Sequence, residues 1–311
     1  MNKFIVTTTI NPPTKATLKF CEIAEEKGWT FVIIGDTLTP HSSYERLEGR
    51  YRSVTYLSPD DQYKRYPELS DSLGWKTIQR RNIGFIHAYD EGSDILATVD
   101  DDNIPYSYWG EDILLNKEVS CEVYDSGSLD VFDPLSTTNN NQLWHRGYPI
   151  QLLEHRSCNY VETEKRKFLV QADLWDGDPD IDAIARLTFS PEVKYDTNVP
   201  FCSNSISPFN SQNTFIAREV VPHYMMLPYI GRFDDIWGSY IMQYYYPKSV
   251  VYNRSTVYQE RNDQDLIQNL EDEIFGYRNT LDLLNNLSDW RSLLPDKSKI
   301  FVDKYQACFN I

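Results

Sequence analysis

The stretch FIVTTTINPPTKATLKFCEIAEEKGWTFVIIGD, residues 4–36, decides the fold class. Its two apolar ends have the composition of buried strands, and Asn-Pro-Pro-Thr at 11–14 breaks the first strand and is suited to cap a helix. A strand, a helix and a second strand at this spacing form a βαβ unit, in which the strands are parallel and the crossover is right-handed. The stretch therefore predicts an α/β fold, with a strand at 4–10, a helix at 15–27 and a strand at 29–34.

A further apolar run, Ile95 to Val99, has the pattern of a buried strand and ends in Asp100-Asp101-Asp102. Three adjacent like charges repel unless water, a cation or basic side chains compensate them, and hard divalent cations prefer carboxylate oxygen. Ligands of open α/β sheets bind at the carboxyl ends of the strands. We therefore interpret the triplet as a metal site at a strand end, with a solvated acidic turn as the alternative.

Polar residues near these strands are candidates for binding a nucleotide or phosphate. Asp36 directly follows the second strand, where a carboxylate can accept hydrogen bonds from a ribose or base; a solvated turn is equally compatible. A helix is expected over residues 74–89, just before the acidic strand. Its basic cluster is suited either to hold a phosphate together with a metal or to face solvent, and consists of Lys76, Arg80, Arg81 and Asn82.

The composition argues against several classes of protein. The chain of 311 residues has 30 Lys and Arg against 46 Asp and Glu, a net charge of −16, which disfavours nucleic acid as a partner. Five scattered cysteines without a Cys-x-x-Cys pair make a disulfide framework or a zinc cluster unexpected. The polar N-terminus and the lack of any apolar run of about 18 residues predict no signal peptide and no integral membrane segment. We therefore expect a reduced, cytoplasmic protein.

An acidic cluster at 173–182 allows both structural and functional interpretations, because it holds five carboxylates in ten residues. Asp178 or Asp180 is suited to cap a helix expected over 181–187. Capping explains only one or two of these carboxylates. The others are suited to accept hydrogen bonds from sugar hydroxyls or to face solvent.

Two more motifs have a possible role in chemistry. Arg146 lies between aromatic residues in the segment 143–150, where it is suited to clamp a pyrophosphate or to stack in a surface turn. Asp234 and Asp235 open a helix expected over 236–245, whose dipole favours carboxylates in the first turn. The dipole accounts for one of the two, and the other is then a candidate general base.

The rest of the chain has weaker signals. No Gly-rich phosphate loop and no internal repeat is evident, and five histidines give poor support to a Ser-His-Asp hydrolase. The remaining predicted elements are a loop-rich section at 41–53, a strand at 54–57, a helix after residues 214–217 up to about 224, and a last helical stretch from 259 to about 287.

The order of these motifs resembles the STELLO-type glycosyltransferases of the GT-A fold and, more distantly, the reversibly glycosylated polypeptides that act as UDP-arabinopyranose mutases. The resemblance spans residues 3 to 290. After Arg81-Asn82-Ile83-Gly84 and the acidic triplet, the motifs are His145-Arg146-Gly147-Tyr148-Pro149, Asp178-Pro179-Asp180-Ile181-Asp182-Ala183, Asn210-Ser211-Gln212-Asn213-Thr214 and Gly231-Arg232-Phe233-Asp234-Asp235-Ile236-Trp237.

The resemblance implies a single GT-A-like domain with a mostly parallel central sheet flanked by helices. Residues 1–262 would form it, with a nucleotide-sugar-binding half at 1–110 and an acceptor half at 111–262. Residues 263–311 would be a helical extension packed on the same domain.

The resemblance also implies roles for individual residues. Asp100 and Asp102 match the acidic motif that holds Mn²⁺ or Mg²⁺ against the diphosphate of the donor. Asp235 matches the residue near which inverting enzymes place their base, with Asp234 as its neighbour, and Arg146 matches an Arg that becomes glycosylated in the mutases. Many GT-A enzymes have a later His as third metal ligand, but the last His here is His223, so that ligand is expected to be absent or replaced. The residues expected to bind the nucleotide sugar are Thr8, Asp36, Lys76, Arg80, Arg81, Asn82 and Asp101.

Three hypotheses follow for the function. The first is a metal-dependent glycosyltransferase that moves a sugar from a nucleotide-sugar donor, with UDP favoured, to a glycan or other hydroxyl acceptor, and inverts the anomeric configuration with Asp235 as base. The second is a nucleotide-sugar mutase that uses Arg146. The third is a non-catalytic binding or scaffold protein of the same fold.

Overall fold

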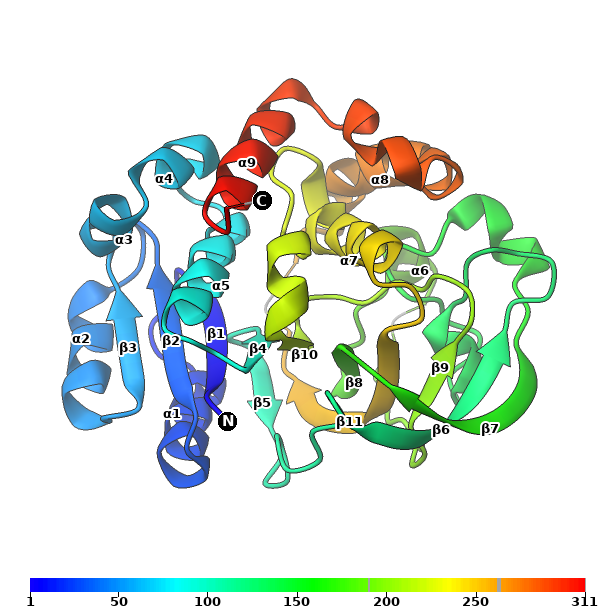
Figure 1. Cartoon of the computed structure of the whole chain (residues 1–311), viewed down its shortest axis with the longest axis horizontal. Helices are drawn as coiled ribbons and strands as arrows, with labels where there is room; N and C mark the ends of the chain where they lie inside the picture. The colour runs from blue at the N-terminus through cyan, green and yellow to red at the C-terminus, as the bar shows by residue number, and fades with distance from the viewer. Residues whose placement is uncertain (190, 262–263, 311) are drawn as a thin grey trace.

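The computed structural model describes residues 1–189, 191–261 and 264–310. The strands are β1 (Lys3–Thr9), β2 (Thr30–Gly35), β3 (Val54–Leu57), β4 (Ile95–Val99), β5 (Asn103–Pro105), β6 (Glu118–Asp125), β7 (Asn159–Lys167), β8 (Val170–Gly177), β9 (Phe201–Ser203), β10 (Asn213–Ala217) and β11 (Val250–Gln259). They form one sheet in the order β3-β2-β1-β4-β10-β8-β11-β9-β6-β7, with β5 paired to β11 off this path. Helices flank this sheet (Figure 1), so the predicted α/β fold is confirmed.

The first half of the sheet follows the βαβ prediction. Parallel pairing joins β1 to β2, β1 to β4 and β2 to β3. The crossover helix α1 (Lys15–Lys27) begins where the Thr14 hydroxyl accepts a hydrogen bond from the Thr17 backbone N–H, and it ends at Gly28 in the left-handed conformation. Both ends of this helix are therefore specified by local sequence.

The second half of the sheet mixes parallel and antiparallel pairs. β10 runs antiparallel to both of its neighbours, β4 and β8, whereas β11 runs parallel to β8. The strand direction therefore reverses between β4 and β10. β6 and β7 form an antiparallel pair at the edge of the sheet, on the right of Figure 1.

The helices match the predictions in part. The α-helices are α1, α2 (His41–Arg50), α3 (Pro59–Arg65), α4 (Pro67–Leu73), α5 (Arg81–Asp90), α6 (Ala183–Thr188), α7 (Asp234–Tyr245), α8 (Leu266–Asn285) and α9 (Asp296–Ala307), and the 3-10 segments are η1 (Ile78–Arg80), η2 (Pro134–Thr137), η3 (Ile150–His155), η4 (Arg218–His223), η5 (Gly231–Phe233) and η6 (Leu287–Leu293). The section at 41–53 was wrongly expected to be mostly loop, since it contains α2. The helix expected over 74–89 begins only at η1. Residue 259 ends β11 instead of starting a helix, and the 3-10 segment η4 replaces the α-helix expected before 224.

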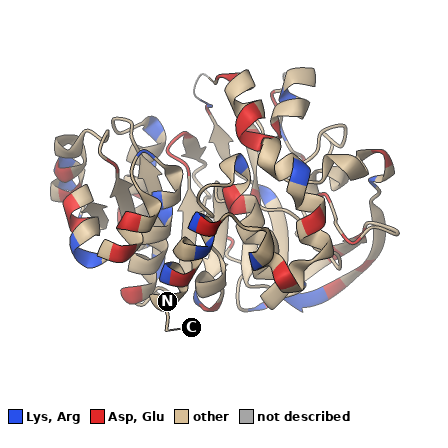
Figure 2. Cartoon of the chain, turned by 90° about the horizontal axis from the view of Figure 1, so that it is seen from above, with Lys and Arg blue, Asp and Glu red and all other residues tan. Residues whose placement is uncertain are grey.

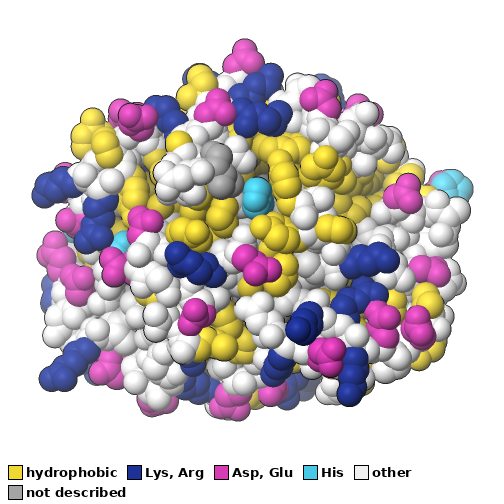
Figure 3. Space-filling model, viewed as in Figure 1, with side chains coloured by type: hydrophobic (Ala, Val, Ile, Leu, Met, Phe, Trp, Pro, Cys, Tyr) yellow, Lys and Arg dark blue, Asp and Glu magenta, His cyan; other side chains and the backbone are white. Residues whose placement is uncertain are grey.

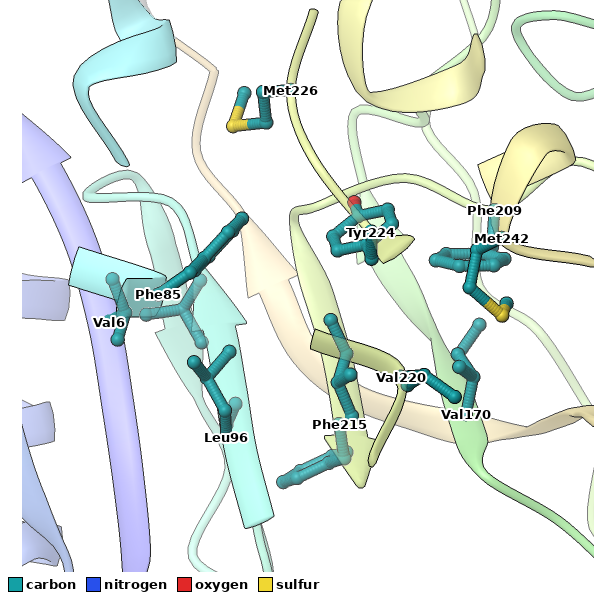
Figure 4. Packing of buried hydrophobic residues seen from close by; sticks show 14 of the residues in the cluster. Val6, Phe85, Leu96, Val170, Phe209, Phe215, Val220, Tyr224, Met226 and Met242 are labelled. Carbon is teal, nitrogen blue, oxygen red and sulfur yellow. The ribbon is translucent and has the colours of Figure 1, made fainter. Parts of the chain in front are cut away.

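Helix α5 packs closely on the parallel half of the sheet. In Figure 4, Phe85 of α5 lies near Val6 of β1 and Leu96 of β4, and all three side chains are buried. A Cβ added to Gly84 would lie only 2.4 Å from Val6 Cγ1, so glycine is what allows this approach. The packing holds the first turn of α5, with Arg81, beside the end of β4.

The C-terminal helices lie across the top of the molecule in Figure 1. α8 packs against η5 and α6, and α9 packs against α4 and η4, so the extension contacts both halves of the chain. The predicted boundary between residues 262 and 263 lies outside the described residues. Within the described ranges, no helix combines the length and apolar character needed to cross a bilayer.

Charges of both signs are distributed over the molecule. Figure 2 shows acidic and basic residues interspersed along the helices. On the face in Figure 3, charged side chains of both signs surround a central area of hydrophobic side chains.

Candidate active site

A cavity of about 540 Å³ lies at the carboxyl ends of β1 and β4 and beside the first turn of α7. The order of the parallel strands reverses here, because the chain adds β2 and β3 on one side of β1 and β4 on the other, and such switch points are where open α/β sheets bind ligands. The lining is rich in charge. Its acidic residues are Asp100, Asp101, Asp102, Asp180, Asp234, Asp235 and Asp272, and its basic residues are Lys76, Arg81, Arg146, Arg232 and Arg261.

The three carboxylates after β4 have different surroundings. Asp100 Oδ1 pairs with a terminal nitrogen of Arg81 at 2.6 Å. Asp101 Oδ2 accepts hydrogen bonds from Thr9 and, at 3.0 Å, from Asn11, so this side chain faces the loop after β1. Asp102 Oδ1 is buried and accepts no hydrogen bond from any described residue. Asp102 is therefore the member of the triplet that still requires a partner.

The triplet has the chemistry of a small-cation site that shares its ligands with a substrate. Burial and the neighbouring Asp100 raise the pKa of Asp102 to about 7, and a bound cation would offset this cost of ionisation. No group of three or more His, Cys, Asp and Glu side chains arranged to hold a metal occurs among the described residues. Mg²⁺ commonly takes only one or two carboxylates and completes its shell with phosphate and water oxygens. Asp100 and Asp102 fit a site of that kind.

Arg146 is an internal ion-pair residue. Its Nε lies 3.0 Å from Asp180 Oδ1, and its terminal nitrogens reach Asp180 Oδ2 at 2.9 Å and the two Asp235 oxygens at 3.0 and 3.2 Å. The last N–H donates to the Arg232 carbonyl. All five N–H groups of Arg146 are thus engaged, and the side chain is buried. No donor is left to clamp a pyrophosphate.

Asp235 is held in its ionised form by the same network. Besides Arg146, its Oδ2 accepts hydrogen bonds from the Ser211 backbone N–H at 2.8 Å and the Ser211 hydroxyl at 3.0 Å. Burial disfavours the charged carboxylate, but Arg146 and these donors together hold the pKa of Asp235 below its ordinary value. A carboxylate with four donors and a lowered pKa is a weak base.

Asp234, the adjacent residue, has the opposite properties. Burial and the charge on Asp235 raise the pKa of Asp234 to about 7. Its Oδ2 accepts a hydrogen bond from Gln79 Nε2 at 2.6 Å, and the Asp235 backbone N–H also favours the ionised carboxylate. Because Asp234 lines the cavity, it is a carboxylate able to take up a proton near neutral pH.

The acidic cluster at 173–182 contributes Asp180 to the cavity lining, and its other four carboxylates lie outside that lining. Asp180 pairs with Arg146, and Asp178 pairs with Arg186 and Arg261 at 2.5 and 3.3 Å. Asp182, rather than Asp178 or Asp180, caps α6 through a hydrogen bond from the Ala185 backbone N–H. That capping prediction was wrong because the helix begins two residues later than expected. These carboxylates are therefore matched by protein donors instead of facing solvent.

The residues predicted to bind the donor separate into two groups. Thr8, Lys76, Arg81 and Asp101 line the cavity, whereas Asp36, Arg80 and Asn82 do not.

The second group supports the surrounding loops. Asp36 accepts hydrogen bonds from the backbone N–H groups of Lys76 and Thr77. Arg80 donates to Gln62 and stacks on Trp75 with its guanidinium carbon 3.5 Å from the ring centre. Asn82 exchanges two hydrogen bonds with the backbone of Met226, at 2.8 and 2.9 Å. Their places are thus beside the cavity and not in its lining.

Many lining residues were not among the predicted site residues, and three of them carry polar contacts that bear on the site. Gln79 reaches Asp234, Arg232 reaches Glu273 at 3.0 Å through Nε, and Arg261 follows β11 at the edge where Glu260 N–H donates to the Asp102 carbonyl. Recognising residues 250–259 as a strand would have placed Arg261 near the acidic triplet. No comparable pattern marks Gln79.

Comparison with known proteins gives a distant similarity. No protein-family model matches the chain. The chain is 23% identical over 233 residues to a protein of Arabidopsis thaliana named "Probable glycosyltransferase STELLO2", and the match covers 68% of this chain and 29% of the plant protein. A structure titled "Crystal Structure of a Mycobacterial Protein" matches with a TM-score of 0.45 at 8% identity, over 91% of this chain and 74% of that one, which is too remote to bear on function. Over 68% of its length the chain is therefore distantly similar to a glycosyltransferase-like protein.

Proposed function

We propose that this protein is a glycosyltransferase that moves a sugar from a nucleotide-sugar donor to an acceptor hydroxyl in the charged cavity. The observation that carries the proposal is the coexistence, in one cavity, of a carboxylate with a pKa near 7, Asp234, and an acidic strand end with an unpartnered oxygen, Asp102. A proton acceptor and a diphosphate site are the two parts that glycosyl transfer requires. The distant similarity to the plant protein supports the same reaction class.

The donor would bind at the end of β4. Asp100 and Asp102 would hold Mn²⁺ or Mg²⁺, and the cation would offset the charge that develops on the departing nucleoside diphosphate. Lys76 is exposed beside this site, and the terminal nitrogens of Arg232 donate to no described residue, so both can contact phosphate oxygens. UDP is the nucleotide we favour.

We assign the base to Asp234 in place of Asp235. Oδ1 of Asp234, which Gln79 does not occupy, accepts the proton of the acceptor hydroxyl, whose oxygen then forms a bond to the anomeric carbon. The bond from that carbon to the diphosphate oxygen breaks, and its electron pair leaves with the nucleoside diphosphate. Attack from the side opposite the leaving group inverts the anomeric configuration. Asp235, which is already saturated with donors, instead fixes Arg146 and Ser211.

The mutase alternative would require a reactive Arg146. Its five N–H groups are engaged by two carboxylates and a carbonyl, so the geometry does not favour attack by this side chain on a sugar.

Calorimetric titration with UDP, GDP and CMP, each with and without Mn²⁺, tests the donor site. We expect one nucleoside diphosphate to bind only when Mn²⁺ is present. In Asp102→Asn we expect this Mn²⁺-dependent binding to be lost. Tight binding of CMP without metal would contradict the role of Asp100 and Asp102. Failure of all three nucleotides to bind would contradict the proposed function.

The Asp234→Asn variant tests the base, with transfer from the identified donor as the assay. We expect transfer to fall by about 10²–10⁴-fold while affinity for the nucleoside diphosphate stays the same. Asp71→Asn, an exposed residue outside the cavity lining, is the matched control. Unchanged turnover in Asp234→Asn would refute the assignment.

A further inference from the structure

We infer that Thr77 and Gln79 form a positioning relay that orients the carboxylate of Asp234 from the opposite half of the chain. The inference rests on the proposed role of Asp234 as the base. It concerns how that base is held, which neither the comparisons nor the sequence motifs address.

The relay consists of consecutive hydrogen bonds. Gln79 Nε2 donates to Asp234 Oδ2 at 2.6 Å, and Gln79 Oε1 accepts the hydroxyl hydrogen of Thr77. The backbone N–H of Thr77 donates in turn to Asp36 Oδ2 at 3.3 Å. Residues 77 and 79 line the same cavity as Asp234, although they are separated from it by about half the length of the chain.

The chemistry of the carboxamide determines which oxygen of Asp234 remains free. Because the Thr77 hydroxyl donates to the amide oxygen of Gln79, the amide nitrogen faces Asp234. This nitrogen occupies Oδ2, and no other side chain among the described residues donates to the carboxylate. The relay therefore presents one defined oxygen of the base to an acceptor hydroxyl.

The loop that carries the relay is anchored. Asp36 is buried at the end of β2 and accepts a hydrogen bond from the Lys76 backbone N–H at 2.7 Å. Lys76 has a left-handed φ of 62°, which few non-glycine residues adopt without support from their surroundings. Asp36 thus has a function that sequence reasoning did not assign to it, since it fixes the loop that fixes the base.

The charged groups that face Asp234 are few. Asp235 on the same helix opposes its ionisation, and Arg146 favours it. Gln79 is neutral and donates to the carboxylate, so it also favours the ionised form. Removing the relay should consequently make Asp234 harder to ionise as well as less well oriented.

Three variants test the relay by their pH profiles of transfer. Gln79→Met keeps the length of the side chain but cannot donate; we expect kcat to fall about 10–100-fold with little change in the KM for the donor. We also expect the acidic limb of the profile to move to higher pH. In Thr77→Val the acidic limb should move in the same direction but less far. In Gln79→Glu it should move by about one pH unit or more, because a second carboxylate then lies beside Asp234. Gln306→Met on α9, outside the cavity lining, is the control.

A readout independent of turnover separates the relay from the proposed function. In protein labelled with ¹³C at the aspartate carboxyl groups, the signal of Asp234 is the one missing from Asp234→Asn, and its titration can be followed by NMR. We expect the midpoint of this titration to rise in Gln79→Met whether or not the protein turns over a donor. Absence of turnover together with such a rise would count against the proposed function and leave the relay intact. A folded Gln79→Met whose Asp234 signal and pH profile match the wild type would overturn the relay.

Discussion

Replacing Arg146 by Met should destabilise the fold strongly, because this guanidinium neutralises two buried carboxylates at once. Asp180 and Asp235 have side chains that are 5% and 4% exposed and pair with Arg146 at 2.9 and 3.0 Å. Met has a similar length but no charge. The variant would leave both carboxylates in the interior without their principal cation.

The magnitude follows from the partners that remain. Removing one member of a buried ion pair costs about 3–5 kcal/mol. The cost should not double for two carboxylates, because Asp180 keeps Asn210 as a donor at 2.9 Å and Asp235 keeps the two donors of Ser211. We therefore expect a loss of about 3–5 kcal/mol in the free energy of unfolding. In a chain of this size that corresponds to a fall in melting temperature of about 5–8 °C.

The pH dependence gives this prediction a second readout. The ion pairs hold the pKa values of Asp180 and Asp235 below the ordinary value, so their stabilisation is present above about pH 4 and is lost as the pH falls through the folded-state values. Without Arg146, burial raises both pKa values, and ionisation costs stability as the pH rises. The difference between wild type and Arg146→Met should thus be larger at pH 8 than at pH 5.

Urea unfolding at both pH values is the assay, and Arg291→Met is the control. Arg291 pairs with Asp303 on the surface, where both side chains are well exposed, and the loss there should not exceed about 1 kcal/mol. Equal stability of Arg146→Met and the control at pH 8, or a difference that does not grow between pH 5 and pH 8, would refute the structural role of Arg146.

Three other outcomes can be checked with simple measurements. After incubation with a nucleotide sugar, mass spectrometry should find Arg146 unmodified, since its N–H groups are all engaged; a glycosylated peptide would revive the mutase alternative. Burial raises the pKa of Asp173 to about 7, so ionisation of this carboxyl costs stability as the pH rises from about 4. Urea unfolding should therefore show Asp173→Asn gaining about 2.5 kcal/mol relative to the wild type between pH 5 and pH 8. Gly238→Ala would place a Cβ 2.1 Å from the Met225 carbonyl oxygen and should lower the free energy of unfolding, measured by thermal unfolding, by about 1–3 kcal/mol. At Gly49 in α2 an added Cβ would have no atom within 4 Å, so Gly49→Ala should raise that free energy by about 0.5–1 kcal/mol.

The part of the fold that the sequence predicts is the part specified by local signals. The helix cap within residues 11–14, the helix at 15–27 and the apolar strands on either side of it are predicted from residues 4–36, and the structure confirms them. The strands of the second half lack such signals. β8 is buried throughout although it contains Asp173 and Asp176, and these carboxylates are accommodated by donors from distant segments.

Edge strand β7 was missed for a different reason. Most of its nine residues are exposed and five of them are charged, a composition that protects a sheet edge from pairing with other chains but resembles a loop in the sequence. The alternation of hydrophobic and polar residues that identifies a strand in a sequence is therefore absent from β7, because most of its side chains are exposed.

The candidate site shows the same division between local and distant causes. The sequence identifies the acidic segments, since clustered carboxylates at strand and helix ends are visible without a structure. Which carboxylates are free depends on arginines far along the chain, as Arg146 pairs with Asp235 at a separation of 89 residues. Adjacent residues on a helix point about 100° apart, so Asp235 faces Arg146 and Ser211 while Asp234 faces Gln79. The two neighbouring carboxylates both line the cavity but acquire opposite pKa shifts from this rotation, and the one with the raised pKa is the one without an arginine partner. A base can thus be distinguished from a structural carboxylate only after the residues that surround each of them are known.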